Sequence, residues 1–162
     1  MTAERLIRLL DLAPHPEEGG FFRETYRSST TFEPGAPFTG TRSHGTAIYY
    51  LLTWDTYSAM HRLPGDEVFH FYMGDPVEML MLPPAGDGDV VVLGQDIAAG
   101  MKLQHVVPGG TWQGSRLAAG GAWALLGATM APGFDYADYV AGSASLLDAY
   151  PAHRAMIQQL LG

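Results

Sequence analysis

Two histidines and a glutamate cluster in the segment Ser58 to Gly74, SAMHRLPGDEVFHFYMG. His61 precedes a Pro-Gly-Asp turn, whereas Glu67 and His70 follow it. If the two flanks pair as a hairpin, the imidazole and the carboxylate come close together across the ladder. Such a pair is suited to acid–base catalysis or to binding a metal ion.

Strand alternation divides these residues between two faces. Side chains alternate along a strand, so Glu67 and Phe69 share one face while His70 and Tyr72 share the other. A regular strand cannot send both Glu67 and His70 into one pocket. We therefore expect either a β-bulge that breaks the alternation or two residues that serve different surfaces.

Short helices are expected at both ends of the chain. Apolar residues repeat at helical spacing from Ala3 to Leu10, with Thr2 as the N-cap and Pro14 ending the run. A second helix is predicted after Pro151, and a shorter one from Ser143.

Between these ends, period-two patterns and turns rich in glycine and proline predict a β protein. The strands are expected at about 21–27, 45–53, 57–63, 67–73, 77–82, 89–93, 104–107, 111–117 and 122–130. No stretch between 45–53 and 122–130 is long and periodic enough for a crossover helix, so a parallel α/β sheet is disfavoured. A sandwich or a jelly-roll barrel is the expected architecture.

Composition narrows the class of protein. The 162 residues are expected to form one domain spanning 1–162, and the chain contains no cysteine. A net charge of -8 and the lack of basic runs argue against nucleic acid as a partner. The apolar runs are too short to span a membrane, and Glu4 and Arg5 stand where a secretory signal would be apolar. A cytoplasmic protein is expected.

The central segment resembles the first motif of the cupin superfamily. His61, Glu67 and Gly74 match that frame, with Leu63 in place of the second histidine. A later segment, PGGTWQ, resembles the second motif, with Gln113 in place of its histidine. Two of the four metal ligands implied by the resemblance are thus replaced.

The whole chain is similar to the cupin-five family, long described as a domain of unknown function. The resembling segments are HPEEGGFFRETYRS (15–28), TAIYYLLT (46–53), SAMHRLPGDEVFHFYMGDP (58–76), VVPGGTWQGSRL (106–117) and MAPGFDYADY (130–139). One departure is the doubled Glu17-Glu18, where many relatives have a single glutamate.

This resemblance implies an all-β fold, a double-stranded β-helix or cupin jelly-roll barrel, with a pocket inside one mouth. It also implies a homodimer formed through the sheet edges, which would hide exposed strands. It does not supply a reaction, because one barrel hosts many chemistries.

The first functional hypothesis is a metal-independent isomerase or epimerase acting on a sugar or nucleotide-sugar type metabolite, as some cupin relatives are. His61 would be the base or its orienting partner, and Glu67 would set its tautomer or act as the acid. Tyr72 or Tyr49 would donate to a developing oxyanion. His70 would join this catalytic set only through a bulge.

The second hypothesis is a metal-dependent dioxygenase or hydrolase with His61, Glu67 and Gln113 as ligands, to which a bulge would add His70 and so restore a facial triad. One histidine, one carboxylate and a neutral amide form a weaker set than the facial triad of two histidines and a carboxylate. No cofactor is therefore expected, and a divalent metal is the alternative.

The third hypothesis is a non-catalytic module that binds a small molecule in the barrel. Its stacking faces would be Trp112, Tyr49 and Phe69, and its hydrogen-bonding groups Gln104, Gln113 and Arg23. The guanidinium of Arg23 would hold an anionic group of the ligand.

The segment around the Gly19-Gly20 turn is assigned a structural role. His15 and Glu17 lie beside this turn and are interpreted as structural rather than catalytic.

Overall fold

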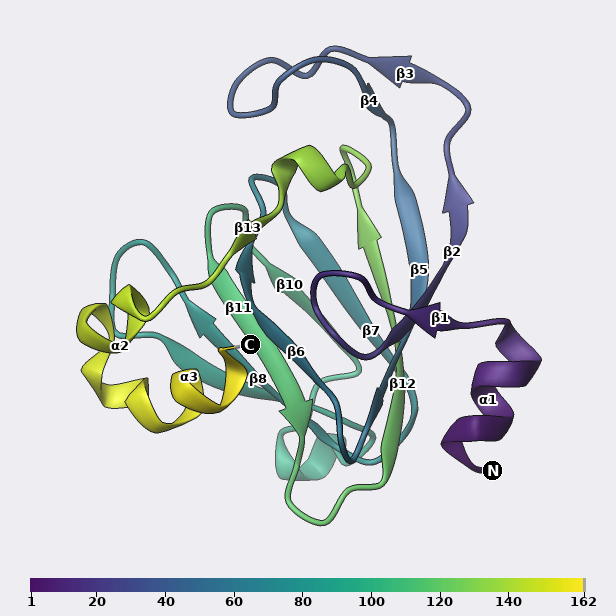
Figure 1. Cartoon of the computed structure of the whole chain (residues 1–162), viewed down its shortest axis with the longest axis vertical. Coiled ribbons are helices and arrows are strands. Elements are labelled where there is room, and N and C mark those ends of the chain that lie inside the picture. The colour runs from purple at the N-terminus through teal and green to yellow at the C-terminus, as the bar shows by residue number, and fades with distance from the viewer. Residues whose placement is uncertain (162) are drawn as a thin grey trace.

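Two antiparallel sheets stack to form a barrel in the computed structural model, which describes residues 1–161 (Figure 1). The six-stranded sheet has the order β1 (Ala13–Pro14), β2 (Phe21–Arg27), β5 (Thr46–Thr53), β12 (Trp123–Met130), β7 (Glu67–Gly74) and β10 (Gln104–Val107). The five-stranded sheet has the order β13 (Val140–Ala141), β6 (Tyr57–Arg62), β11 (Trp112–Leu117), β8 (Val77–Leu82) and β9 (Asp89–Leu93). A separate hairpin pairs β3 (Thr31–Phe32) with β4 (Arg42–Ser43).

The main core lies between the two sheets. On β5, Tyr50 and Leu52 point into the barrel, and on β7 the inward residues include Phe69 and Phe71. The remaining buried members of this cluster are Val77, Met79, Leu93, Val107, Ala124, Leu126 and Ala128. Because one face of each sheet is buried in this way, the period-two pattern fixes the register of the strands. The predicted jelly-roll barrel is confirmed.

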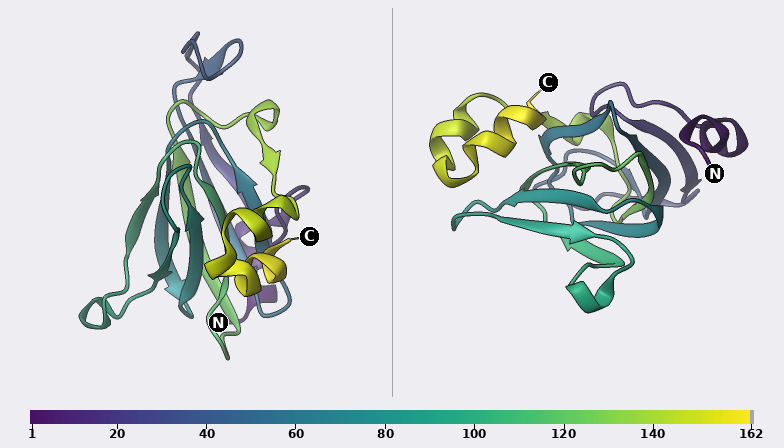
Figure 2. Two further views of the ribbon diagram at one scale, coloured as in Figure 1. Left: turned by 90° about the vertical axis from the view of Figure 1, so that its left-hand side faces the viewer. Right: turned by 90° about the horizontal axis from the view of Figure 1, so that it is seen from below.

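Helices cover the outer faces of the sheets at both ends of the chain (Figure 2). The helix α1 (Ala3–Leu10) packs against the outer face of the six-stranded sheet, and the side chain of Thr2 caps its first turn as predicted. It ends before Pro14, because Asp11 adopts a left-handed conformation with φ of 52°. None of the helices within residues 1–161 is long and apolar enough to cross a membrane.

The C-terminal helices α2 (Ser145–Ala149) and α3 (Arg154–Leu160) cover the five-stranded sheet. Leu146, Ile157 and Leu160 from these helices pack on Met60 and Leu80 of the sheet. Three short 3₁₀ turns complete the fold: η1 (Ile97–Ala99), η2 (Tyr136–Asp138) and η3 (Pro151–His153).

The β3–β4 hairpin projects from one end of the barrel (Figure 1) and is tied back by a buried ion pair. Arg42 is 5% exposed and donates two hydrogen bonds to the carboxylate of Asp138, at 2.9 and 2.5 Å. Its remaining nitrogen donates to the carbonyl oxygens of Thr39 and Thr41. The pair links β4 to η2, which lies beside the open end of the barrel.

Candidate functional site

A cavity of about 70 Å³ lies inside the barrel at the end nearest the β3–β4 hairpin. It is lined by residues of β2, β5, β7 and β12, by the loop between β1 and β2, and by the segment before β13. The lining residues are His15, Glu18, Phe22, Glu24, Arg27, Thr46, Ile48, Leu63, Glu67, Ala128, Met130, Phe134 and Tyr136. The cavity therefore combines an apolar wall with several carboxylates.

The β1–β2 loop, residues 15–20, brings Glu18 into the barrel. Gly19 has φ of 88°, and a Cβ atom there would lie 2.6 Å from the carbonyl oxygen of Tyr57, so only glycine fits. The hydroxyl of Tyr50 donates to the carbonyl oxygen of Gly19 at 2.8 Å. The amide of Ala59 donates to the carbonyl oxygen of Glu18 at 2.8 Å. These contacts fix the loop against β5 and β6.

A bulge in β6 turns two of its polar residues toward this loop. The register with β11 shifts so that Gln113 pairs with His61 while Ser115 pairs with Ser58, and Ala59 and Met60 together face Gly114. An extra residue of this kind reverses the alternation of faces. Ser58 and His61 consequently both point into the barrel, and the Ser58 hydroxyl donates to Oε2 of Glu18 at 3.3 Å.

The main chain fixes the tautomer of His61. Its Nδ1 lies 2.8 Å from the carbonyl oxygen of Ala59, which can only accept, so Nδ1 carries a proton. In the neutral ring, Nε2 then holds a lone pair. That atom is buried without a hydrogen-bond partner, in a side chain that is 1% exposed. The ring also stacks on Tyr139, with centroids 5.3 Å apart.

The main chain fixes the opposite tautomer in His15. Its Nδ1 accepts the backbone N–H groups of Glu17 and Glu18, at 3.3 and 2.9 Å, so the ring proton resides on Nε2. Burial lowers the pKa of His15 below its usual value, outweighing the attraction of Glu18 for the charged form. His15 is thus a neutral donor at Nε2.

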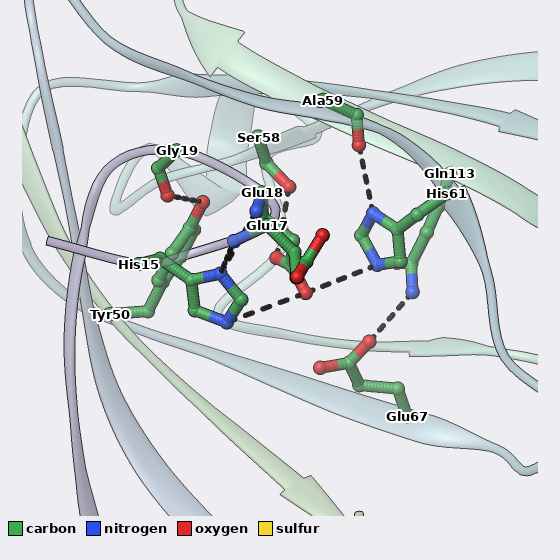
Figure 3. Close-up of polar contacts among 10 residues, drawn as sticks. All are labelled: His15, Glu17, Glu18, Gly19, Tyr50, Ser58, Ala59, His61, Glu67 and Gln113. Atoms are coloured by element: carbon green, nitrogen blue, oxygen red, sulfur yellow. Dashed lines mark hydrogen bonds and ion pairs between the residues drawn. The ribbon is translucent and has the colours of Figure 1, made fainter. Parts of the chain in front are cut away.

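The carboxylate of Glu18 lies between the two imidazoles (Figure 3). Its Oε1 is 3.9 Å from Nε2 of His15 and 3.6 Å from Nε2 of His61. The first contact is favourable because His15 presents a proton. The second places two acceptors face to face, which is favourable only when a proton is shared between them. Glu18 and His61 therefore form a pair suited to accepting a proton.

Glu67 provides a second carboxyl group with different chemistry. It is 8% exposed, and its Oε2 accepts a hydrogen bond of 2.6 Å from the Gln113 amide. Burial, together with the charge of Glu18, raises the pKa of Glu67 to about 7. This carboxyl group is therefore substantially protonated at neutral pH and is able to act as an acid.

Four residues predicted at the site face the interior of the barrel. His61, Glu67 and Gln113 converge near the cavity, and Phe69 belongs to the core cluster between the sheets. The alternation of side chains along β7 explains why both Glu67 and Phe69 point into the barrel.

His70 and Tyr72 lie elsewhere, on the outer face of the six-stranded sheet. His70 contacts Thr129 and Gln104 through its two ring nitrogens, and Tyr72 is 44% exposed. The irregularity in the β7–β12 pairing lies after His70, between the partners of Phe71 and Met73, so it leaves His70 on the outside. Glu67 and His70 thus serve different surfaces, which is the second of the two alternatives that strand alternation left open.

The other predicted binding residues also point outward. Tyr49 packs against the α1 side of the six-stranded sheet, and the Arg23 guanidinium lies 6.0 Å from its ring centroid. Gln104 is exposed beside His70. Trp112 packs among the C-terminal helices, with the Arg62 guanidinium 4.7 Å from its ring centroid. None of these four residues lines the cavity within the described chain.

The sequence interpretation missed Glu18 and gave His15 a purely structural role. The structure places both beside His61, whereas Glu17 is exposed. A His-x-x-Glu spacing directly before two glycines was the available signal, since a tight turn brings such residues together. The cavity-lining Tyr136 and the His61 neighbour Tyr139 were also missed, because their positions depend on long-range packing.

The residues at the cupin ligand positions do not fit a metal centre. Leu63 lines the cavity without a donor atom, and Gln113 directs its N–H toward Glu67. His15 would have to lose its backbone hydrogen bonds or its Nε2 proton to become a ligand. Within residues 1–161, no group of three or more histidine and carboxylate side chains is arranged to hold a metal ion.

A double-stranded β-helix with a cavity in its mouth is the architecture of the cupin class. The family model described as Cupin superfamily (DUF985), Cupin_5, matches residues 4–141, and the chain belongs to this family. The uncharacterized protein YML079W of Saccharomyces cerevisiae is 31% identical over 149 residues, covering 85% of this chain and 74% of the relative.

Solved structures agree with this assignment. A hypothetical protein from Leishmania major has a TM-score of 0.90 at 33% identity, covering 99% of both chains. Protein SO0799 from Shewanella oneidensis has a TM-score of 0.89 at 36% identity, covering 100% of this chain and 98% of that one. A cupin 2 domain-containing protein from Halorhodospira halophila, at 12% identity and a TM-score of 0.60, shares the fold over 93% of this chain and 88% of its own.

Proposed function

We propose that this protein is a metal-independent enzyme of the isomerase or epimerase type, acting on a small sugar-type metabolite. The observation that carries the proposal is the pairing of two unlike carboxyl groups in one cavity. Glu18 adjoins the lone pair of His61, while Glu67 has a pKa of about 7. Titratable groups with such different environments are typical of an acid and a base that act together.

Glu18 is the base in this proposal. It lines the cavity, and His61 Nε2 behind it is able to take up the proton that Glu18 receives. The hydroxyl of Ser58 donates to Oε2 of the same carboxylate and orients it, and the Nε2–H of His15 lies on the other side, 3.9 Å from Oε1. His61 and His15 are thus positioning residues, and Glu18 and Glu67 are the groups that meet the substrate.

The reaction is a proton transfer next to a carbonyl group. Glu18 removes a proton from the carbon beside the substrate carbonyl, and the electron pair of that C–H bond forms a C=C bond. The carbonyl oxygen takes the proton of Glu67, which gives an enediol and a Glu67 carboxylate. Return of that proton from Glu18 to the former carbonyl carbon yields an isomer. An epimer forms when the first carbon instead takes a proton from solvent on its opposite face and Glu18 releases its own proton to solvent. The hydroxyl proton goes back to Glu67, so neither oxidant nor reductant is consumed.

Proton exchange with solvent tests this proposal before the substrate is identified. Glyceraldehyde, dihydroxyacetone and glucosamine are incubated with the protein in D₂O, and loss of the C–H signal is followed by NMR. We expect exchange above the buffer rate for at least one probe, with a loss of about 10²-fold or more in Glu18→Gln and in Glu67→Gln. Glu33→Gln, at an exposed loop residue, is the matched control and retains the rate.

Two outcomes would contradict the proposal. Exchange that survives both substitutions would remove the two carboxyl groups from the mechanism. If none of the three probes exchanges above the buffer rate, a binding module without turnover becomes the better account of the cavity.

A further inference from the structure

The cavity contains more negative than positive charge. Three of the described lining residues are glutamates, namely Glu18, Glu24 and Glu67, whereas Arg27 is the single lysine or arginine among them. His15 adds no charge, because both backbone contacts to Nδ1 hold it in the neutral form. This balance opposes the entry of a phosphate or a carboxylate.

The guanidinium of Arg27 already forms hydrogen bonds within the protein. Its Nε and Nη2 donate to the two carboxylate oxygens of Glu24, at 2.9 and 2.7 Å, and Nη2 also donates to the carbonyl oxygen of Phe134. A bidentate pair of this kind satisfies the guanidinium in a fixed geometry. The remaining charge of the cavity is that of Glu18, to which Glu67 adds when it ionises.

One buried acceptor atom beside the cavity has no donor among residues 1–161. Nε2 of His61 is buried, unpartnered and directed at Oε1 of Glu18, 3.6 Å away. Two acceptors that face each other in this way are stabilised either by a proton shared between them or by a hydrogen from a bound third group. An ammonium group suits this need because it has three N–H donors and no acceptor.

Aromatic rings complete the wall of the cavity. Phe134 and Tyr136 form an edge-to-face pair with centroids 4.9 Å apart, and Phe22 packs on His15 at 4.5 Å. Ring faces attract cations, and most strongly in a desolvated site. Carboxylates and aromatic rings together are the usual surroundings of a bound amine.

We infer that the cavity selects a small substrate that carries an amino group in its ammonium form, and that it excludes phosphorylated and acidic metabolites. The negative charge of Glu18 attracts the ammonium group while Glu18 keeps its role as the base, and Phe22, Phe134 and Tyr136 lie around the carbon atoms of the substrate. This inference rests on the proposed function for the chemistry at Glu18 and Glu67, and it names the class of substrate for that site.

Three unreactive probes of similar size test the charge preference: ethanolamine, ethylene glycol and glycolate. Each is titrated at constant ionic strength, and binding is measured from the shifts of the backbone amides of the β1–β2 loop by NMR. We expect ethanolamine to bind at least tenfold more tightly than ethylene glycol, and glycolate to show no saturation. Glu18→Gln should bring ethanolamine to the level of ethylene glycol, whereas Glu33→Gln should leave the preference intact.

A second measurement covers the case in which Glu18→Gln fails to fold. The affinity of the wild type for ethanolamine should fall as salt is raised, and that for ethylene glycol should not. Equal binding of all probes, tighter binding of glycolate, or no binding of ethanolamine would overturn the inference. These probes bind without reacting. Such a result would therefore overturn the substrate class alone, and the proposed proton exchange would still be tested separately by the D₂O experiment.

Discussion

His15 and His61 present opposite states of the imidazole Nε2 to the same oxygen of Glu18. His15 offers a proton and His61 a lone pair, and in each ring a main-chain contact to Nδ1 determines which. The carboxylate therefore lies between a donor nitrogen on one side and an acceptor nitrogen on the other. In the proposed mechanism, this asymmetry would direct a proton from Glu18 towards His61.

The first prediction concerns the pH dependence of stability. The carboxyl group of Glu67 has a pKa of about 7 in the folded state against 4.5 for the free group. The folded protein therefore binds this proton more tightly than the unfolded chain, and stability is lost as pH rises from about 4.5 through 7. The loss from this group is about 3 kcal/mol at 1.36 kcal/mol per pKa unit.

Glu67→Gln removes that dependence. Urea denaturation of wild type and variant should give similar free energies of unfolding near pH 4.5 and a more stable variant at pH 8. Glu33→Gln should follow the wild type at both values. A wild-type protein that gains stability relative to Glu67→Gln as pH rises would contradict the burial of an uncharged carboxyl group.

The second prediction concerns the β1–β2 loop. Gly19→Ala introduces a positive φ strain of about 1–2 kcal/mol and a clash with the carbonyl oxygen of Tyr57. Gly40→Ala is the matched control, since Gly40 also has a positive φ, of 74°, but no atom within 4 Å of the added carbon. Thermal denaturation should show the larger loss at Gly19, with a difference of about 1–3 kcal/mol from overpacking. Equal losses of stability in the two variants would mean that the loop moves away from Tyr57 without a free-energy penalty.

The third prediction concerns the buried pair that ties the β3–β4 hairpin to η2. Arg42→Met leaves the carboxylate of Asp138 without its partner and should cost about 1–3 kcal/mol, because the pair is covered by its own hairpin and η2 but lies at the end of the barrel. The double variant Arg42→Met with Asp138→Leu removes both charges and should be more stable than Arg42→Met alone. Chemical denaturation of the four proteins of this cycle gives the coupling energy. Additive effects would show that the two side chains act independently.

The fourth prediction concerns metal binding. Leu63 and Gln113 occupy cupin ligand positions and face the interior of the barrel near His61 and Glu67. The double variant Leu63→His with Gln113→His supplies the missing imidazoles, and His61 already holds its lone pair on Nε2. Calorimetry with Co²⁺ should show binding at least tenfold tighter than in the wild type. The control, Leu63→Phe with Gln113→Ala, should bind Co²⁺ no more tightly than the wild type. Tight binding of Co²⁺ by the wild type would contradict the conclusion that the natural residues do not fit a metal centre.

The parts of the fold that obey local rules were predictable from the sequence. Alternation identified the long strands such as β5 and β7, and helical spacing with Thr2 as the cap identified α1. The strands β1, β3, β4 and β13, with two residues each, were missed, because so few residues carry no periodicity and pair only through distant contacts.

The site was predictable only where it follows the same local rules. Glu67 occupies an inward-facing position in the alternation of a regular strand, and Gln113 occupies a position of the second cupin motif. His70 and Tyr72 lie away from the cavity, because their position next to the motif in sequence corresponds to the opposite face of the sheet. Glu18 lies in a loop, where no periodicity indicates direction, and its meeting with His61 depends on the tertiary fold.

Ala59, in the bulge of β6, contributes to the site without using its side chain. Its amide holds the carbonyl oxygen of Glu18, and its carbonyl oxygen holds Nδ1 of His61. A scan of side-chain truncations would pass over this position, because the residue is already alanine. A change to the peptide unit itself, such as Ala59→Pro, would remove the amide that holds Glu18 while leaving every charged group of the cavity present. In this protein, the backbone conformation at the β6 bulge thus positions two side chains of the site, and side-chain identity alone does not define it.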